Sequence, residues 1–516
     1  MKHIYKNRKM YIYLLISILS IGIGLRLYKL GNRSLWFDES LPLISTVDAL
    51  KILLSGKFYY PIAYASLVHY YWTIVGNSEF MLRLSSAVFG AASIIAFYFL
   101  AKLLFNKKAG LFSAFILSIS PFHIYYSQEL RMYSLISLLS LVSAYCLIKS
   151  IRVNKNIYWL GYALFNIINI YVHPMAIFIL ISEMLFFLLY IGKYKYLITR
   201  WVVSNLVISI FLIPWIISMF SGLGLVIARD NWFFESTLSW IPAINAKNLF
   251  YTFKNFSAGY NAAKEIYLIA MALFFILFCI GITKSSRRKE ALSLSLLCLF
   301  IPVFSAAIIS RFRPCYLDRY FIPSSLFYCL IIGNGLSGLK KRYAFTAAAC
   351  VVFLSICALK NFYADYLPGT FIEHIGVQAK KDYMGAAKYA AENLKKEDVI
   401  FHTCRNTVPS FMYYFDRLYK GGGKLKKNMV LKFHEDSDKL STSEYATDEL
   451  HRFIEKQEGV NLDRQDRIWI IYSGWDFNIA MRPESPESKV IRWMDKRYII
   501  KDSQSFSGIK LYLYIK

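Results

Sequence analysis

Charged residues are scarce in this chain. Asp, Glu, Lys and Arg make up 18% of its 516 residues, whereas 56% are hydrophobic and 17% are aromatic. Average protein sequences carry about 25% charged residues. The mean hydropathy of +0.40 agrees with this deficit. The composition therefore favours a membrane protein over an ordinary soluble domain.

Cysteine is also rare and irregularly placed. Six of the eight cysteines lie inside apolar runs, namely Cys146, Cys279, Cys298, Cys329, Cys350 and Cys357. None of the eight forms a Cys-x-x-Cys pair or a Cys/His spacing typical of zinc sites. The sequence therefore predicts neither a disulfide framework nor a metal knuckle.

Acidic residues are few in the first part of the chain. Residues 1–361 hold 35 Lys/Arg and 11 Asp/Glu, whereas residues 362–516 hold 25 and 22, within a net charge of +27. The basic excess lies in the apolar part, where Lys and Arg report membrane topology. We therefore expect no nucleic-acid partner, and we expect the two parts to occupy different environments.

Long apolar runs are abundant. About 20 apolar residues are needed to cross roughly 30 Å of hydrocarbon. Runs of this kind occur at 10–28, 84–105, 109–126, 133–150, 157–172, 174–192, 201–221, 265–283, 291–310, 320–337 and 343–361. No small-residue cleavage site follows the first run, so we interpret it as a retained span rather than a signal peptide. The sequence predicts a polytopic α-helical membrane protein with about eleven transmembrane helices.

Every second join between these runs is short and basic. The basic joins contain Lys6/Arg8/Lys9, Lys107/Lys108, Lys149/Arg152/Lys155, Lys193/Lys195/Arg200, Arg287/Arg288/Lys289 and Lys340/Lys341/Arg342. The positive-inside rule assigns these joins to the cytoplasm. With an odd number of spans, the N-terminus is predicted to be cytoplasmic and the C-terminal part to lie outside the cytoplasmic membrane.

The chain is expected to divide into a transmembrane domain, residues 1–365, and a small extracytoplasmic α/β domain, residues 366–516. The transmembrane domain carries two long outer loops, 29–83 and 222–264. In the tail, "DYMGAAKYAAENLKKED" has helical spacing, whereas "VIFHT" and "RIWIIYSG" are typical of buried strands. "GIKLYLYIK" alternates as an edge strand does.

Three outer clusters could carry chemistry. Asp38 and Glu39 follow the first span, where they could act on a substrate or lie near the start of a short interfacial helix. Gln128, Glu129 and Arg131 occupy a short loop, where Arg131 could hold a lipid-linked phosphate or merely snorkel beside its counter-ion.

The third cluster lies in "SRFRPCYLDRYFIP", residues 310–323. It places Arg311, Arg313 and Arg319 on the outer side against the positive-inside trend, which favours a phosphate site. His173 is either a polar interface residue or a ligand of substrate or metal. Glu183 lies within a span, where it is a functional candidate or an interhelical hydrogen-bond partner.

The order and spacing of three segments carry a resemblance to a known class. "LWFDES", "YYPIAYASLVHYYWTIVGNSEFMLRLSSAVFG" and "SPFHIYYSQELRMYSL" resemble the polytopic glycosyltransferases with the GT-C fold. More narrowly, they resemble the family-39 type, the relatives of protein O-mannosyltransferases and of the lipid A aminoarabinose transferase. That family usually has His-Pro-Pro or Lys-Pro-Pro where this chain has Tyr59-Tyr60-Pro61. The role that the basic residue has in the family is therefore not expected here.

The resemblance implies transfer of a hexose or pentose from a polyprenyl-phosphate donor to a hydroxyl of an acceptor glycan, lipid or protein outside the cytoplasmic membrane. It implies that Asp38 is the catalytic base and that Arg131 holds phosphate. We expect Glu39 to support Asp38. The candidate substrate-binding residues are Gln128, Glu129, Arg131, Tyr133, His173, Arg313, Arg319 and Tyr320.

Two questions stay open in the sequence. Asp38, Glu39, Glu129 and His173 are possible ligands of a divalent metal, yet no spacing fixes a metal site. A transporter or flippase of a lipid-linked substrate is the alternative function. A transporter would need polar or broken helices near mid-bilayer. Here the ionisable residues gather at one surface, with Glu183 as the main exception, and we therefore prefer the enzyme hypothesis.

Overall fold

The computed structural model describes residues 2–44, 62–228, 241–369, 373, 375–377, 379–395, 398–419, 428–430, 465–473 and 485–516. The chain divides into two compact units. The helical unit comprises Met1–Leu30 and Val47–Val377, and the α/β unit comprises Gly31–Thr46 and Gln378–Lys516. The sequence instead placed a single boundary between residues 365 and 366. The described part of the first segment, residues 31–44, belongs to the α/β unit because hydrogen bonds, described below, attach it to the helices of that unit.

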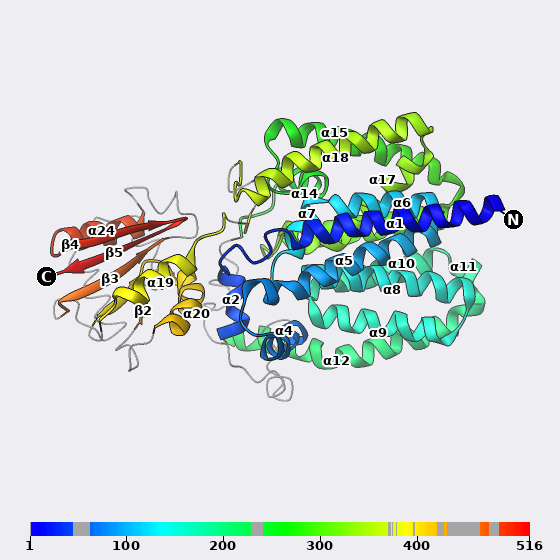
Figure 1. Ribbon diagram of the computed structural model, residues 1–516. Helices are drawn as coiled ribbons and strands as arrows, with labels where there is room; N and C mark the ends of the chain where they lie inside the picture. The colour runs from blue at the N-terminus through cyan, green and yellow to red at the C-terminus, as the bar shows by residue number, and fades with distance from the viewer. Residues whose placement is uncertain are drawn as a thin grey trace. The chain divides into compact units, whose positions relative to one another are not determined.

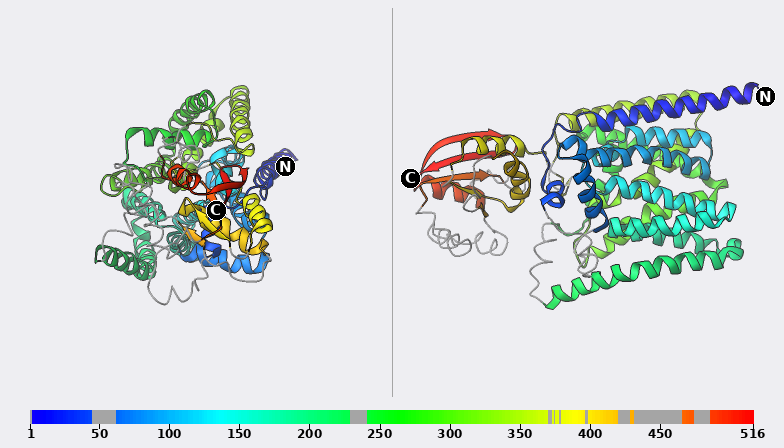
Figure 2. Two further views of the ribbon diagram at one scale, coloured as in Figure 1. Left: turned by 90° about the vertical axis from the view of Figure 1, so that its left-hand side faces the viewer. Right: turned by 60° about the horizontal axis from the view of Figure 1, so that its bottom comes forward.

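A helix covers each of the eleven expected apolar runs, and the long helices of this unit run alongside one another (Figures 1 and 2). These helices are α1 (Lys2–Leu27), α5 (Glu79–Leu104), α6 (Lys107–Ile119) with α7 (Pro121–Ser127), α8 (Tyr133–Val153), α9 (Asn156–Val172), α10 (Ile177–Leu189), α12 (Ile198–Ala228), α15 (Lys264–Lys284), α16 (Lys289–Ile309), α17 (Ile322–Gly338) and α18 (Lys341–Tyr363). Shorter elements are α4 (Ile62–Val75), η1 (Pro174–Ala176), α11 (Ile191–Tyr194), η2 (Lys195–Leu197), α14 (Ala246–Ala258), η3 (Ser285–Arg287) and η4 (Asp318–Phe321).

Within the described residues, eight helices are long and apolar enough to cross a membrane, or nine if α6 and α7 form one broken span. The number is below eleven because α9 has 17 residues and the apolar helix Pro174–Leu189 is also short. The 61° bend between α6 and α7 falls at Ser120, whose hydroxyl accepts a hydrogen bond from His123 N–H at 3.4 Å. Pro121 begins α7, where a missing N–H costs nothing.

Helix α17 lies at the centre of the helical unit, because all of its residues from Ile322 to Ser337 are buried. Glycines allow its neighbours to approach closely. A Cβ built on Gly335 would lie 2.2 Å from the Leu277 carbonyl oxygen of α15, and one on Gly333 would lie 2.3 Å from Ser113 Oγ of α6. Such small-residue contacts are the usual basis of helix packing in membranes. The rigid α17 therefore fixes the position of η4 at its N-terminus.

The intramembrane carboxyl of Glu183 is held between helices. It is fully buried and accepts hydrogen bonds from Ser143 of α8 and Asn166 of α9, both at 2.8 Å. These bonds join α8, α9 and α10. Of the two readings that the sequence left open for Glu183, the structure supports the interhelical one.

The α/β unit contains a five-stranded sheet in the order β2-β1-β3-β5-β4. Its strands are β1 (Val399–His402), β2 (Asn428–Val430), β3 (Arg467–Tyr472), β4 (Ile499–Phe506) and β5 (Ile509–Ile515). β1 pairs in parallel with β2 and β3, whereas β5 is antiparallel to β3 and β4. Helix α24 (Pro486–Asp495) packs on one face. Helices α19 (Tyr383–Asn393) and α20 (Val408–Leu418) supply ring contacts to the strand residues of the other face.

The sequence correctly predicted the buried strands β1 and β3 and the helix α19. The prediction that "GIKLYLYIK" is an edge strand was wrong, because β4 pairs along the outer side of β5. β4 is polar and partly exposed, so it takes the edge position, as edge strands commonly do.

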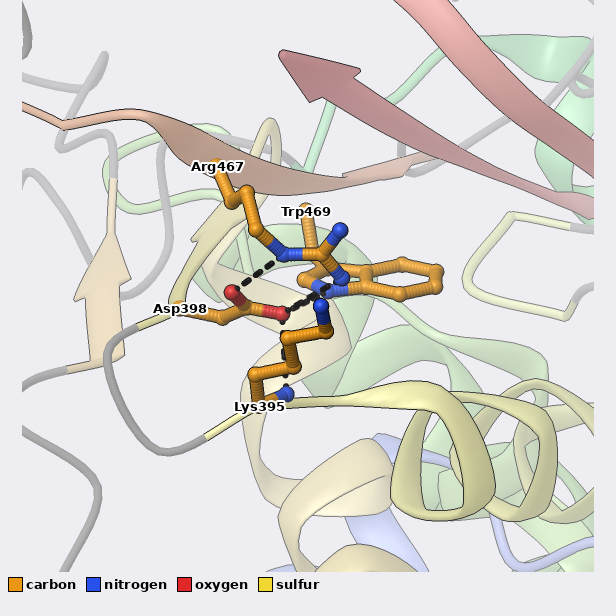
Figure 3. Close-up of polar contacts among 4 residues, drawn as sticks. All are labelled: Lys395, Asp398, Arg467 and Trp469. Atoms are coloured by element: carbon orange, nitrogen blue, oxygen red, sulfur yellow. Dashed lines mark hydrogen bonds and ion pairs between the residues drawn. The ribbon is translucent and has the colours of Figure 1, made fainter.

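A buried carboxylate ties the start of β1 to β3 (Figure 3). Asp398 accepts hydrogen bonds from Arg467 Nε at 2.7 Å, from Trp469 Nε1 at 2.8 Å and from Lys395 N–H at 3.0 Å. Arg467 Nη2 donates a further bond at 3.1 Å. Because several donors satisfy this buried charge, it fixes the sheet without remaining available for chemistry.

Candidate functional site

Three turns between helices bring together the main candidates in the helical unit. Arg131 lies in the turn between α7 and α8, His173 lies between α9 and η1, and Arg319 belongs to η4. Their exposed fractions are 3%, 5% and 5%. Two guanidinium groups and an imidazole are thus buried near one another, a costly arrangement that proteins keep mainly for function.

Aromatic rings connect the three turns. The Tyr133 ring lies 6.1 Å from that of His173 and 4.7 Å from that of Tyr126. The His173 ring also contacts the Tyr320 ring, at a distance of 4.9 Å between their centres. The guanidinium carbon of Arg131 is 5.9 Å from the centre of the Tyr133 ring. Of the expected substrate-binding residues, the structure therefore groups Arg131, Tyr133, His173, Arg319 and Tyr320, which we call the arginine cluster.

His173 is neutral in this setting. Burial, together with the positive charges of Arg131 and Arg319, lowers the pKa of His173 to about 3. Its Nδ1 accepts a hydrogen bond from Met175 N–H at 3.2 Å, which places the ring proton on Nε2. The positive charge of the arginine cluster therefore comes from its two guanidinium groups.

Helix α14 anchors the element that carries Arg319. Asp318 accepts hydrogen bonds from Thr252 Oγ1 and Asn255 Nδ2, both at 2.6 Å. Arg319 itself donates to the Gly376 carbonyl oxygen at 2.6 Å. Sequence reasoning missed this anchor, although Asn248, Thr252 and Asn255 are spaced along one helix face. That polar stripe was the available signal.

Lys254 is a further buried cation that the sequence did not single out. It is 1% exposed, and its Nζ donates to the Tyr260 carbonyl oxygen at 3.3 Å. Burial lowers the pKa of Lys254 to about 8, although the negative charges of Glu373 and Asp318 oppose the shift. The Tyr260 hydroxyl in turn lies 2.7 Å from that of Tyr126. No spacing in the sequence marks Lys254.

The structure places three other candidate residues, Gln128, Glu129 and Arg313, in different surroundings. The side-chain nitrogen of Gln128 donates to the carbonyl oxygens of Leu25, Arg26 and Tyr28 at the end of α1, at 3.1, 3.0 and 2.8 Å. Gln128 thus has a structural role in capping α1. Glu129 is buried beside it, and its carbonyl oxygen accepts from Arg131 N–H at 2.7 Å. Arg313 follows α16 and is exposed.

Asp38 and Glu39 lie in the α/β unit, in the first turn of α2 (Phe37–Ile44). Glu39 is fully buried, and its Oε2 accepts from Trp36 N–H at 3.4 Å, which is half of a capping box. Asp38 is only partly buried. The two residues therefore differ: Glu39 is buried and supports the start of α2, which was one of the two sequence interpretations, whereas Asp38 stays partly exposed.

Within the described ranges, no group of three or more His, Cys, Asp or Glu side chains is arranged to hold a metal ion. Tyr59, Tyr60 and Pro61, where the family motif is expected, lie outside the described residues.

Comparison with known proteins identifies the fold. The structure is similar to the archaeal oligosaccharyltransferase AglB from Archaeoglobus fulgidus, in complex with an inhibitory peptide and a dolichol-phosphate. The TM-score is 0.54 at 11% identity, over 98% of this chain and 74% of AglB. It is also similar to ArnT from Cupriavidus metallidurans, with a TM-score of 0.57 at 10% identity, over 96% of this chain and 97% of ArnT. For ArnT bound to undecaprenyl phosphate the TM-score is 0.53 at 11% identity, over the same shares.

AglB and ArnT are glycosyltransferases of the GT-C fold that depend on polyprenyl-phosphate donors, so this chain is a polytopic membrane protein of the GT-C fold class. Residues 60–218 match the family model described as dolichyl-phosphate-mannose-protein mannosyltransferase. No curated protein matches the chain by sequence. These findings confirm the predicted fold class, including the small C-terminal α/β part.

Proposed function

We propose that this protein transfers a sugar from a polyprenyl-phosphate donor to an acceptor hydroxyl. The observation that carries the proposal is the arginine cluster, which places the buried guanidinium groups of Arg131 and Arg319 beside neutral His173. A guanidinium is suited to a phosphate because its planar donors match the phosphate oxygens. The GT-C fold and the match of residues 60–218 to a mannosyltransferase family support the same reaction class.

The residues have distinct roles in the proposed reaction. The acceptor oxygen bonds to the anomeric carbon of the sugar, and the bond from that carbon to the lipid phosphate breaks with its electron pair. Asp38 takes the proton of the acceptor hydroxyl. Arg131 and Arg319 stabilise the negative charge that develops on the departing lipid phosphate. Tyr133 and Tyr320, which pack on the imidazole, shape the same site.

The sugar is proposed to be a hexose or pentose, and the acceptor a glycan, lipid or protein. AglB was captured with a peptide and ArnT with undecaprenyl phosphate, so both kinds of ligand are known in structures of this fold.

The test is a transfer assay. Purified protein in vesicles is incubated with a radiolabelled polyprenyl-phosphate sugar and with an extract of envelope acceptors. The proposed enzyme forms a labelled glycosylated product and releases polyprenyl phosphate. A flippase would move the intact donor across the bilayer without either product. Movement of intact donor, with no product from a panel of hexose and pentose donors, would refute the proposal.

We further propose that the protein lies in the cytoplasmic membrane with a cytoplasmic N-terminus and the α/β unit outside. The six basic joins of the sequence support this orientation. A reporter enzyme that is active only outside the cytoplasm should be active when fused after Lys516. Activity of a cytoplasm-specific reporter at the same position would reverse the topology.

A further inference from the structure

The base segment, residues 31–44, is part of the α/β unit rather than of the helical unit that carries the arginine cluster. We propose that α19 and α20 position Asp38 for the transfer reaction by fixing this segment, with Tyr414 and Ser410 as positioning residues. The inference rests on the proposed function of Asp38. It assigns to the C-terminal part of the chain a role in catalysis.

Helix α20 holds the base segment on both sides of Asp38. Before it, the N–H of Leu35 donates to the Tyr414 hydroxyl oxygen at 2.7 Å. After it, Ser40 Oγ lies 3.0 Å from Ser410 Oγ. Leu35, Ser40 and Ser410 are fully buried. Asp38 thus lies between two residues, Leu35 and Ser40, that are both bonded to helix α20.

Helix α19 and the residues before it provide a second attachment. Ser34 Oγ accepts from the N–H of Met384 at 3.0 Å and donates to Asp382 at 3.3 Å. Met384 lies in the first turn of α19, where backbone N–H groups lack partners within the helix. The Lys380 ammonium lies 4.7 Å from the centre of the Trp36 ring. The base segment therefore completes the cap of α19 while α19 holds the base segment.

Helix α2 depends on these contacts for its stability. An eight-residue helix is not stable by itself in water, because its nucleation cost exceeds what so few hydrogen bonds return. Its buried contacts with α20 must therefore supply the stability. Catalysis requires the base to lie within about 3 Å of the acceptor hydroxyl, and a displacement of about 1 Å can cost roughly a hundredfold in rate. Loss of the attachments should consequently lower turnover even when Asp38 is intact.

The first experiment tests the docking independently of activity. Ser40→Cys and Ser410→Cys are combined, and the full-length protein in membranes is treated with a mild oxidant. The two Oγ atoms lie 3.0 Å apart, so a disulfide should form in the double variant and in neither single variant. Cross-linking is read by proteolysis and gel mobility, and it is expected even if the protein proves not to transfer sugar. Absence of the cross-link would overturn the proposed docking.

The second measurement links docking to turnover. The oxidised double variant should have a kcat at least as high as that of its reduced form, because the disulfide restores the link between α2 and α20 that the two hydroxyl groups provide. Tyr414→Phe removes the partner of the buried Leu35 N–H, so kcat should fall about tenfold with little change in the KM for the donor. A cross-linked protein that loses activity reversibly on oxidation would show that the docked state is not the active one.

Tyr413→Phe is the matched control for Tyr414→Phe. It makes the same change one residue earlier in α20, where the ring stacks on the Arg417 guanidinium at 4.1 Å and would remain stacked. We expect Tyr413→Phe to lower kcat less than Tyr414→Phe does. Equal kcat values for wild type, Tyr413→Phe and Tyr414→Phe, all folded, would refute the positioning role. If wild type itself lacks transfer activity but the cross-link forms, the proposed function fails and the docking stands.

Discussion

Asp38→Asn is expected to lower kcat by about a hundredfold or more, the usual scale for loss of a general base. Asparagine keeps the size of the side chain and most of its hydrogen bonding but cannot accept the acceptor's proton. Asp38 is only partly buried, so the protein should keep its stability, and donor binding should change little. Steady-state transfer rates and donor titration of the purified variant measure both effects.

Glu39→Gln is the matched comparison for Asp38→Asn. Glu39 is fully buried and accepts from Trp36 N–H, which an amide oxygen can also do. We therefore expect a smaller loss of kcat, together with a modest loss of thermal stability. Near-wild-type turnover of folded Asp38→Asn would reduce the pair to a helix cap. A larger loss of kcat in Glu39→Gln than in Asp38→Asn would show that Asp38 is not the base.

Arg319→Ala is expected to raise the KM for the donor by roughly 10- to 100-fold, because a charge-assisted hydrogen bond contributes about 1.5–3 kcal/mol. Arg131→Lys keeps the charge but loses the planar fork, so its transfer rate should also fall well below that of wild type. Both residues are buried, so each variant must first be shown to be folded and inserted. Donor titration in vesicles gives the KM of each.

Arg313→Ala is the comparison for Arg319→Ala, since both arginines come from the same basic loop. Arg313 is exposed, whereas Arg319 is 5% exposed and bonds to the Gly376 carbonyl oxygen. The Arg313 change should therefore weaken donor use less than the Arg319 change. If folded Arg319→Ala and Arg131→Lys both transfer sugar at normal rates, the phosphate is held elsewhere.

Much of the helical unit could be predicted from sequence because each span is determined locally. A helix in hydrocarbon satisfies its own backbone hydrogen bonds, so a run of apolar residues is enough to specify it. All eleven expected runs coincide with helices, although α9 and α10 are shorter than a full span. The strands β1 and β3 were likewise visible as short, continuous apolar runs.

The candidate site was only partly predictable. Sequence named Arg131, His173 and Arg319 as separate candidates, because each is a polar residue at the end of an apolar run. It did not show that His173 is neutral, since its lowered pKa depends on burial and on the two cations that folding brings beside it. It also missed Lys254, because burial of a lysine leaves no trace in local sequence.

The residues of the chain by themselves determined which segments become helices and where polar groups occur at their ends, because hydrophobicity and helix formation act over a few turns. Only the tertiary structure decided which of those polar groups meet. It joined Asp318 to Thr252 and Asn255, and it used Gln128 to cap α1. It also gave the segment of Asp38 to the α/β unit. The reason is physical: a hydrogen bond between residues tens or hundreds of positions apart depends on how whole helices pack, and local sequence does not encode that packing.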